Sequence, residues 1–229
     1  MPDDRRPSVP PPEAGKRSSV ESKRRILDAA EAEFAAKGFD GARLGNIARA
    51  ASVQQALIHH YFVDKEGLYR EVVERALGAI TTEGWDILAR SVAQTKGGIK
   101  ITEDDLRPLV DDFIALLQRF FPEHGSILAI VRHEAQGGGA LGVDVVRARV
   151  KPVFDAVTAY LDALKEGGAL RTDVDVRHLC ISAMSMVGFP MMETQLLSAL
   201  WPVDPSARGW RDAARREIVD TIVRRLLPE

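Results

Sequence analysis

The stretch that decides the fold of this chain is LGNIARAASVQQALIHHYF, residues 44–62. Its first half predicts a helix of two turns, because apolar residues recur at positions i, i+3, i+4 and i+7. This apolar stripe consists of Leu44, Ile47, Ala48 and Ala51. Ser52 then interrupts the pattern, so the first helix is short and ends in a tight turn.

The second half of the stretch predicts another short helix with an apolar inner side and a polar outer side. Val53, Ile58 and Phe62 can turn inward. The outer surface then carries Gln54, Gln55, His59 and His60. Two short helices joined by a tight turn are typical of a helix-turn-helix that reads DNA. Glutamine suits this role because its amide can form two hydrogen bonds with an adenine edge.

The composition is that of an ordinary globular protein, with 45% hydrophobic and 28% charged residues. A length of 229 residues leaves room for the helix-turn-helix and a sizeable second core. The formal net charge is −2, so the chain as a whole is not basic. Binding to DNA then depends on where the basic residues lie, and on dimerisation, which doubles the number of phosphate contacts.

Several classes of protein and site are disfavoured by the sequence. The single cysteine, Cys180, excludes a disulfide framework and a thiolate metal site, which favours a cytoplasmic location. No apolar run reaches the roughly 20 residues of a membrane span, and no hydrophobic signal region opens the chain. His59 and His60 diverge by roughly 100° on a helix and cannot easily share a metal. We expect no membrane contact, metal or cofactor.

A catalytic role is disfavoured as well. Cys180 lies close to His178, but no third residue is spaced to orient the pair, so we expect a buried thiol and no catalytic residue. A helical metal hydrolase would need carboxylates and histidines at ligand spacing. No pair of segments supplies such a set.

The N-terminal third is expected to consist of a tail and three helices before the long helix that follows. Residues 1–18 are rich in proline, serine and charge, which is typical of disorder. A helix over residues 20–37 is expected to end at Gly38 in a left-handed cap. Asp64 can cap a helix that runs to residue 88 or 89. The predicted parts are a disordered tail (1–18), a DNA-binding domain (19–80) and an effector-binding and dimerisation domain (81–229).

The remainder of the chain is predicted to be helical, with no strand and no internal repeat. Thr102 and Asp105 have the spacing of a capping box, and Pro122 is expected to end the helix that they begin. Pro190 is expected to kink a later helix that Asp173 or Asp175 can cap. The predicted helices cover residues 102–121, 126–136, 143–166, 176–199 and 207–226. The fold class is therefore all-α.

The N-terminal residues resemble a known family. Over about 50 residues, the chain looks like the N-terminal domain of TetR-type transcriptional regulators. The residues that carry this resemblance are Arg25, Ile26, Leu27, Asp28, Ala29, Ala30, Phe34, Gly38, Phe39, Ile47, Ala48, Ala51, Val53, His60, Tyr61, Phe62, Lys65, Glu66 and Leu68.

The resemblance implies a three-helix DNA-binding domain followed by a larger helical domain. Proteins of this family form dimers, usually repress transcription, and release DNA when a small molecule enters the C-terminal domain. The expected partners are therefore a palindromic double-stranded DNA operator, a small-molecule effector and a second copy of the chain. Two alternatives stay open: an activator in place of a repressor, and a DNA-binding protein without an effector.

The chain departs from the family pattern at several positions. Ser52 stands where the family usually has glycine in the turn, at a cost of about 1 kcal/mol if a positive φ is needed. Gln54 replaces the usual serine cap, and His59 replaces the habitual tyrosine. Ala42 and Arg43 stand where serine or threonine commonly meets phosphate. The expected DNA-binding residues are Arg43, Gln54, Gln55, His59, His60, Tyr61 and Lys65.

The effector site is expected in the C-terminal half. Apolar side chains there can line a pocket for a mainly apolar molecule, with a polar cluster of Arg132, His133 and Glu134 supplying a few hydrogen bonds. The candidate effector-binding residues are Trp85, Phe113, Phe120, Arg132, His133, Met184 and Phe189.

Dimerisation is expected through residues 176–199 and 207–226. Closed two-fold dimers are the commonest assemblies, and two recognition helices must reach successive major grooves. The apolar stripe of the last helix, which includes Ile218 and Ile222, is expected at this interface.

Overall fold

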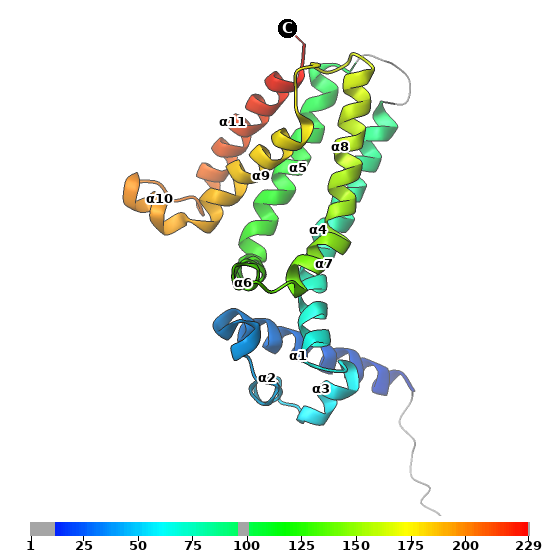
Figure 1. Cartoon of the computed structure of the whole chain (residues 1–229), viewed down its shortest axis with the longest axis vertical. Helices are drawn as coiled ribbons and strands as arrows, with labels where there is room; N and C mark the ends of the chain where they lie inside the picture. The colour runs from blue at the N-terminus through cyan, green and yellow to red at the C-terminus, as the bar shows by residue number, and fades with distance from the viewer. Residues whose placement is uncertain (1–11, 96–100, 229) are drawn as a thin grey trace, which may run out of the picture.

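The computed structural model of the chain describes residues 12–95 and 101–228 and is all-helical (Figure 1). No strand occurs in these two ranges, and no helix within them is long and apolar enough to cross a membrane. The helices are α1 (Pro12–Gly41), α2 (Leu44–Ala50), α3 (Gln55–Tyr61), α4 (Lys65–Gln94), α5 (Glu103–Glu123), α6 (Gly125–Gln136), α7 (Leu141–Arg149), α8 (Lys151–Glu166), α9 (Val176–Met192), α10 (Thr194–Leu200) and α11 (Arg208–Leu226).

Helices α1, α2 and α3 form the lower part of the molecule, and α5 to α11 form an upper bundle (Figure 1). Helix α4 belongs to both parts. Asp64 caps it by accepting a hydrogen bond from the Gly67 amide at 2.7 Å. At 1.5 Å per residue, a helix of this size extends about 45 Å, which is enough to reach from the lower part into the upper bundle.

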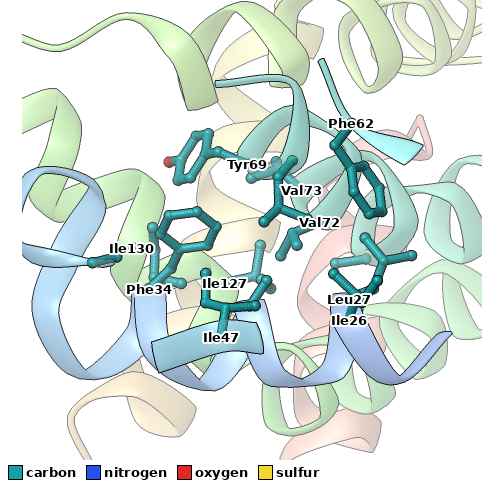
Figure 2. Close-up of a cluster of buried hydrophobic side chains, with 14 of the residues drawn as sticks. Ile26, Leu27, Phe34, Ile47, Phe62, Tyr69, Val72, Val73, Ile127 and Ile130 are labelled. Atoms are coloured by element: carbon teal, nitrogen blue, oxygen red, sulfur yellow. The ribbon is translucent and has the colours of Figure 1, made fainter. Parts of the chain in front are cut away.

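The first hydrophobic core fills the lower part. Figure 2 shows Phe34 beside Tyr69, and the two rings meet edge to face with their centroids 5.2 Å apart. Ile127 and Ile130 of α6 belong to the same core, as does Val145 of α7. The packing of the lower part therefore continues into α6 and α7, beyond the boundary predicted near residue 80.

The second hydrophobic core lies in the upper bundle and draws on α5, α8, α9 and α11. Ile80 of α4 packs against both cores. Ile218 and Ile222 are only 6% and 4% exposed and belong to this core. The prediction that Ile218 and Ile222 lie at the dimer interface is therefore wrong, because the protomer itself buries these two side chains.

The first helix begins earlier than predicted, and it is interrupted at Gly38, where the sequence predicted its end. Helix α1 begins at Pro12, earlier than expected, so residues 12–18 are not a disordered tail. Proline is compatible with the first turn of a helix, where its missing N–H is not needed. The rest of the predicted tail lies outside the described residues. Gly38 has φ 68° and ψ 178°, so α1 is interrupted there before it ends at Gly41.

Two predicted long helices are each divided in the structure. The helix expected over residues 143–166 is split into α7 and α8 at Val150. Pro152 explains the division, because proline lacks an N–H and its ring clashes with the preceding turn. The helix expected over 176–199 is split at Glu193, where φ is −113° and ψ is 37°, rather than at Pro190.

The expected capping interactions are present in the upper bundle. The Asp105 amide donates to the Thr102 hydroxyl at 3.3 Å, and the Thr102 amide donates to the Asp105 carboxylate at 3.0 Å. This confirms the capping box of α5. Asp175 rather than Asp173 caps α9, through a hydrogen bond from the His178 amide at 3.0 Å. Helix α5 continues through Pro122 and ends one residue later.

The turn between α2 and α3 generates a test of backbone strain. Ser52 has φ 54°, the only positive φ of a non-glycine residue in the described part of the chain. Ser52→Gly should raise the free energy of unfolding by about 0.5 to 1 kcal/mol, because glycine adopts this conformation without a Cβ clash. Urea unfolding measures the change.

The matched control is Ala50→Gly, two residues earlier, at the exposed last residue of α2. It should lower the free energy of unfolding by about 1 kcal/mol, the usual cost of glycine in a helix. A loss of stability in Ser52→Gly equal to that of the control would show that the turn is unstrained.

Candidate nucleic-acid interface

Helices α2 and α3 are held against the lower core by their inner sides. Ile47, Ala48 and Ala51 are buried on the α2 side, and Ile58 and Phe62 are buried on the α3 side. The helix-turn-helix fold predicted from residues 44–62 is therefore confirmed. This packing leaves the opposite side of α3 free for a partner.

The turn between the two helices fixes the angle at which α3 leaves α2. The Val53 amide donates to the Ala48 carbonyl at 2.9 Å, across Ser52 in its left-handed conformation. Gln54 occupies the N-cap of α3 in an extended conformation, and its side chain forms no capping hydrogen bond. The Gln54 amide group is thus available for an external partner, as expected of a residue that is a poor cap.

The outer face of α3 is polar and exposed. Gln55, His59 and His60 all lie on it. Gln55 is the first residue of α3, and its side-chain oxygen lies beside Gly45 of α2, where a Cβ would be 3.5 Å away. These residues lie together on the outer face of α3, as predicted from the sequence. Their contacts with bases remain a prediction.

Tyr61 differs from the other expected DNA-binding residues because its hydroxyl is used within the protein. It donates to the Ser19 carbonyl at 3.1 Å and lies 2.8 Å from the Ser19 hydroxyl. Tyr61 therefore ties α1 to α3. Any contact of this side chain with DNA would compete with these two interactions.

Lys65 also has partners inside the protein. Its ammonium group donates to the Asp40 carbonyl at 3.2 Å and lies 4.8 Å from the centre of the Phe39 ring. Cation–π contacts of this kind stabilise exposed sites only modestly. Lys65 stands at the first turn of α4, beside the end of α1, and a phosphate contact there remains a prediction.

A carboxylate organises the start of α2. Glu33 accepts hydrogen bonds from the Asn46 side chain at 2.9 Å, from Lys37 at 2.9 Å and from the Arg43 backbone amide at 3.3 Å. The bonds from Asn46 and then Lys37 hold the pKa of Glu33 below its usual range. Glu33 thereby fixes the backbone at Arg43, whose side chain is exposed; a phosphate contact of Arg43 remains a prediction.

Arg49 is a candidate that the sequence analysis did not single out. It is exposed in the last turn of α2, and its guanidinium lies 3.5 Å from the Asn46 side-chain oxygen. The sequence does indicate the exposure of Arg49. It follows directly after Ile47 and Ala48 of the apolar stripe, so its side chain must point away from the core.

The structure separates the residues expected at the effector site. A cavity in the upper bundle is lined by apolar residues of α4, α5, α8, α9 and α11, and these include Phe113 and Met184. The other five expected residues lie outside it. Phe120 belongs to the first core, and Trp85 and Phe189 are 44% and 51% exposed.

The expected polar cluster does not face this cavity. Arg132 forms an ion pair with Glu193 at 3.4 Å on the surface. His133 lies against Gly38 of α1, where a Cβ would be 3.7 Å from its Nδ1 atom. Consecutive residues on a helix point in different directions. Here Arg132 points toward Glu193, whereas His133 and Glu134 point toward α1, α4 and α7.

Glu134 has a structural role that sequence reasoning missed. Its carboxylate accepts hydrogen bonds from the Tyr69 hydroxyl at 2.6 Å and from the Leu141 and Gly142 amides at 2.7 and 2.8 Å. Burial of Tyr69, together with its bond to Glu134, raises the pKa of its hydroxyl well above the usual range. The Glu134 carboxylate thus joins α4 to the start of α7.

Two family models match the chain. The model described as "Bacterial regulatory proteins, tetR family" matches residues 26–72. A second model, described as "Tetracyclin repressor-like, C-terminal domain", matches residues 108–222. The first match covers the helix-turn-helix described above, and the second covers half of the chain within the upper bundle.

Curated proteins and solved structures are similar over most of the chain. The transcriptional repressor NicS of Pseudomonas putida is 23% identical over 181 residues, which cover 78% of this chain and 80% of NicS. The transcriptional regulator RutR of Escherichia coli K12 is 29% identical over 172 residues, 72% of each protein. A TetR family transcription regulator from Marinobacter aquaeolei has a TM-score of 0.60 at 18% identity, over 93% of this chain and 100% of its own. At 18% identity, the similarity to the Marinobacter aquaeolei structure shows a shared fold alone.

The position of Gln55 predicts how the chain reads DNA. Gln55→Ala should weaken binding to a DNA site selected from random sequences by about 1 to 3 kcal/mol, the cost of losing one good pair of base contacts. Binding to unrelated DNA should hardly change. Fluorescence anisotropy with both kinds of DNA measures the two affinities.

Gln94→Ala provides the matched control, since Gln94 is an exposed glutamine at the far end of α4. It should leave both affinities unaltered. An equal loss on selected and unrelated DNA for Gln55→Ala would mean that Gln55 positions the protein and does not read a base.

Proposed function

This chain belongs to the TetR family of bacterial transcriptional regulators, and we propose that it is a repressor that leaves its operator when a small molecule enters the upper bundle. The proposal rests on the position of α4. It begins beside the recognition helix α3 and also forms one wall of the cavity in the upper bundle. A movement of the cavity wall can therefore reach the DNA-binding part along one continuous helix.

The operator is proposed to be palindromic double-stranded DNA bound by a dimer. Regulators of this family bind operators and dimerise. In a two-fold dimer, recognition helices about 34 to 36 Å apart, or at a longer in-phase distance, reach successive major grooves. The proposed contacts are made by Arg43, Gln54, Gln55, His59 and His60, with Arg49 added, and by Tyr61 and Lys65 if their internal partners are exchanged.

The proposed dimer surface is the exposed apolar side of α9 and α10. Ile181 and Phe189 are 59% and 51% exposed on α9. Leu196 and Leu200 are 51% and 59% exposed on α10, a helix without a single buried residue that projects from the side of the bundle (Figure 1). Large exposed apolar side chains that lie on two adjoining helices are expected at a protein interface.

Phe189 provides a test of this surface. Phe189→Glu should dissociate the dimer, because a charge would be buried against apolar side chains, and should weaken operator binding at the same time. Sedimentation velocity measures the dimer, and anisotropy measures the DNA affinity.

Val92→Glu is the control, because Val92 is a large apolar residue of α4 that is 37% exposed away from α9 and α10. Val92→Glu should sediment at the same rate as the wild-type dimer. A tight dimer in Phe189→Glu would place the interface elsewhere.

We propose that a movement of the cavity wall reaches α4 through α7, and that this movement causes the release of DNA. Val150 and Val153 line the cavity at the junction of α7 and α8. At its other end, α7 begins at the two amides that Glu134 holds, and Glu134 also holds Tyr69 of α4. A ligand that pushes α8 outward would therefore pull on Tyr69, whose ring contacts Phe34 of α1. A hundredfold loss of DNA affinity requires about 2.7 kcal/mol of such coupling.

The Tyr69–Glu134 bond has a signature at alkaline pH. The pKa of Tyr69 is raised in the folded protein, so its contribution to stability is present below the unfolded value of about 10 and is lost as the pH rises further. Between pH 9 and 11, the free energy of unfolding should fall more steeply in the wild type than in Tyr69→Phe, by up to about 1.4 kcal/mol per pH unit.

Urea unfolding across this pH range measures the difference. Tyr69→Phe should also lose about 1 to 3 kcal/mol near pH 8, since it deletes a hydrogen bond to a charged group. Parallel pH curves for the two proteins would show that the Tyr69 hydroxyl does not hold its proton more tightly when folded.

A further inference from the structure

The cavity in the upper bundle is small, lies among five helices and is partly open to solvent. Its volume is about 110 Å³, and its walls come from α4, α5, α8, α9 and α11. Phe113, Phe154 and Met184 are among its larger apolar side chains. Polar side chains in its wall are few, namely Thr81, Tyr160 and Cys180.

The hydroxyl groups in the wall already have partners within the protein. Thr81 donates to the Leu77 and Gly78 carbonyls of its own helix, at 3.1 and 2.9 Å. The Tyr160 hydroxyl donates toward the Ser91 carbonyl and the Thr95 hydroxyl, both at 3.3 Å. A ligand that needs a hydrogen-bond donor from the wall would have to break one of these interactions.

No charged side chain belongs to the described lining of the cavity. Burial in this apolar wall, and to a smaller extent the nearby carboxylate of Asp162, raise the pKa of Cys180 to about 11. The thiol is therefore neutral at pH 7. A charged ligand would lose its hydration without gaining a partner in the wall, and a charge that is buried without a partner is strongly disfavoured.

The size of the cavity sets the size of its ligand. A closed cavity of about 150 Å³ lined by Leu, Ile and Phe stays dry and binds benzene. The cavity of the present chain is somewhat smaller but has flexible side chains in its wall, including Met184, which adapt to irregular shapes. A single ring or a short hydrocarbon chain fits this volume.

We infer that the ligand of this cavity is an uncharged, hydrocarbon-like molecule of about one ring, held by packing alone. This inference rests on the proposed function, since it names the chemical class of the proposed effector. It also differs from the sequence-based expectation of a ligand held by hydrogen bonds from Arg132, His133 and Glu134, because these residues lie outside the cavity wall.

Three probes of matched size test the inference on the full-length protein without DNA. They are toluene, benzoate and benzylammonium, which are neutral, negative and positive at pH 7. Calorimetric titration should show toluene binding about a hundredfold more tightly than either ion, as expected when a charge must be buried without a partner. Equal or tighter binding of benzoate or benzylammonium, or no binding of toluene up to its solubility, would overturn the inference.

A substitution in the wall ties this binding to the cavity. Ala183 lines the cavity, so Ala183→Leu should fill part of it and reduce toluene binding at least tenfold. The matched control is Ala89→Leu, on the exposed side of α4, which should bind toluene as the wild type does. Toluene binding that is unchanged in a folded Ala183→Leu would place the ligand elsewhere.

Cys180 gives a second measurement that needs no substitution. It is the only cysteine of the chain and lies in the cavity wall. Saturating toluene should slow its alkylation by N-ethylmaleimide, and benzoate at the same concentration should not. An alkylation rate that toluene leaves unaltered would contradict binding at this wall.

Operator affinity measured with toluene separates this inference from the proposed function. Toluene that binds in the cavity yet leaves operator affinity unaltered would contradict the release mechanism while it supports the ligand class. A charged effector that releases DNA from the wild type and from Ala183→Leu alike would support ligand-responsive repression and overturn the inference about the cavity.

Discussion

The rest of the structure depends on one constraint: both hydrophobic cores pack against the same helix. Tyr69 near the start of α4 lies in the first core, Ile80 in its middle packs against both, and Leu88 lines the cavity of the upper bundle. Protein interiors are close-packed, so one core cannot shift along α4 without disturbing the other. The recognition helix is therefore positioned by packing that includes α6 and α7 as well as its own neighbours.

The cavity lies where α4 and α8 approach each other closely. A Cβ on Gly84 of α4 would be 3.0 Å from the Val153 side chain of α8. Both residues also line the cavity. In the proposed release mechanism, a ligand that enlarges the cavity moves α8 away from α4 and moves α7 with it. The first amides of α7 are bound to Glu134, so such a movement would reach the first core.

Local patterns in the sequence predicted the parts of the fold that local interactions decide. The apolar spacing of residues 44–62, the turn at Ser52 and the capping box of Thr102 depend on near neighbours, and all three are present. The effector site depends on how helices far apart in the sequence are turned toward each other. The sequence therefore found Phe113 and Met184 among the wall residues but also proposed a polar cluster, at residues 132–134, that faces other helices.

The distance between the two recognition helices tests the central claim most directly, namely that the occupied cavity changes their spacing. Spin labels on His60→Cys, in a Cys180→Ala background, would report this distance in the dimer by pulsed electron resonance. We expect ligand-free protein to include distances compatible with successive major grooves, and saturating toluene to shift the distribution away from them. A distribution that toluene leaves unchanged, in protein shown to bind it, would contradict the account.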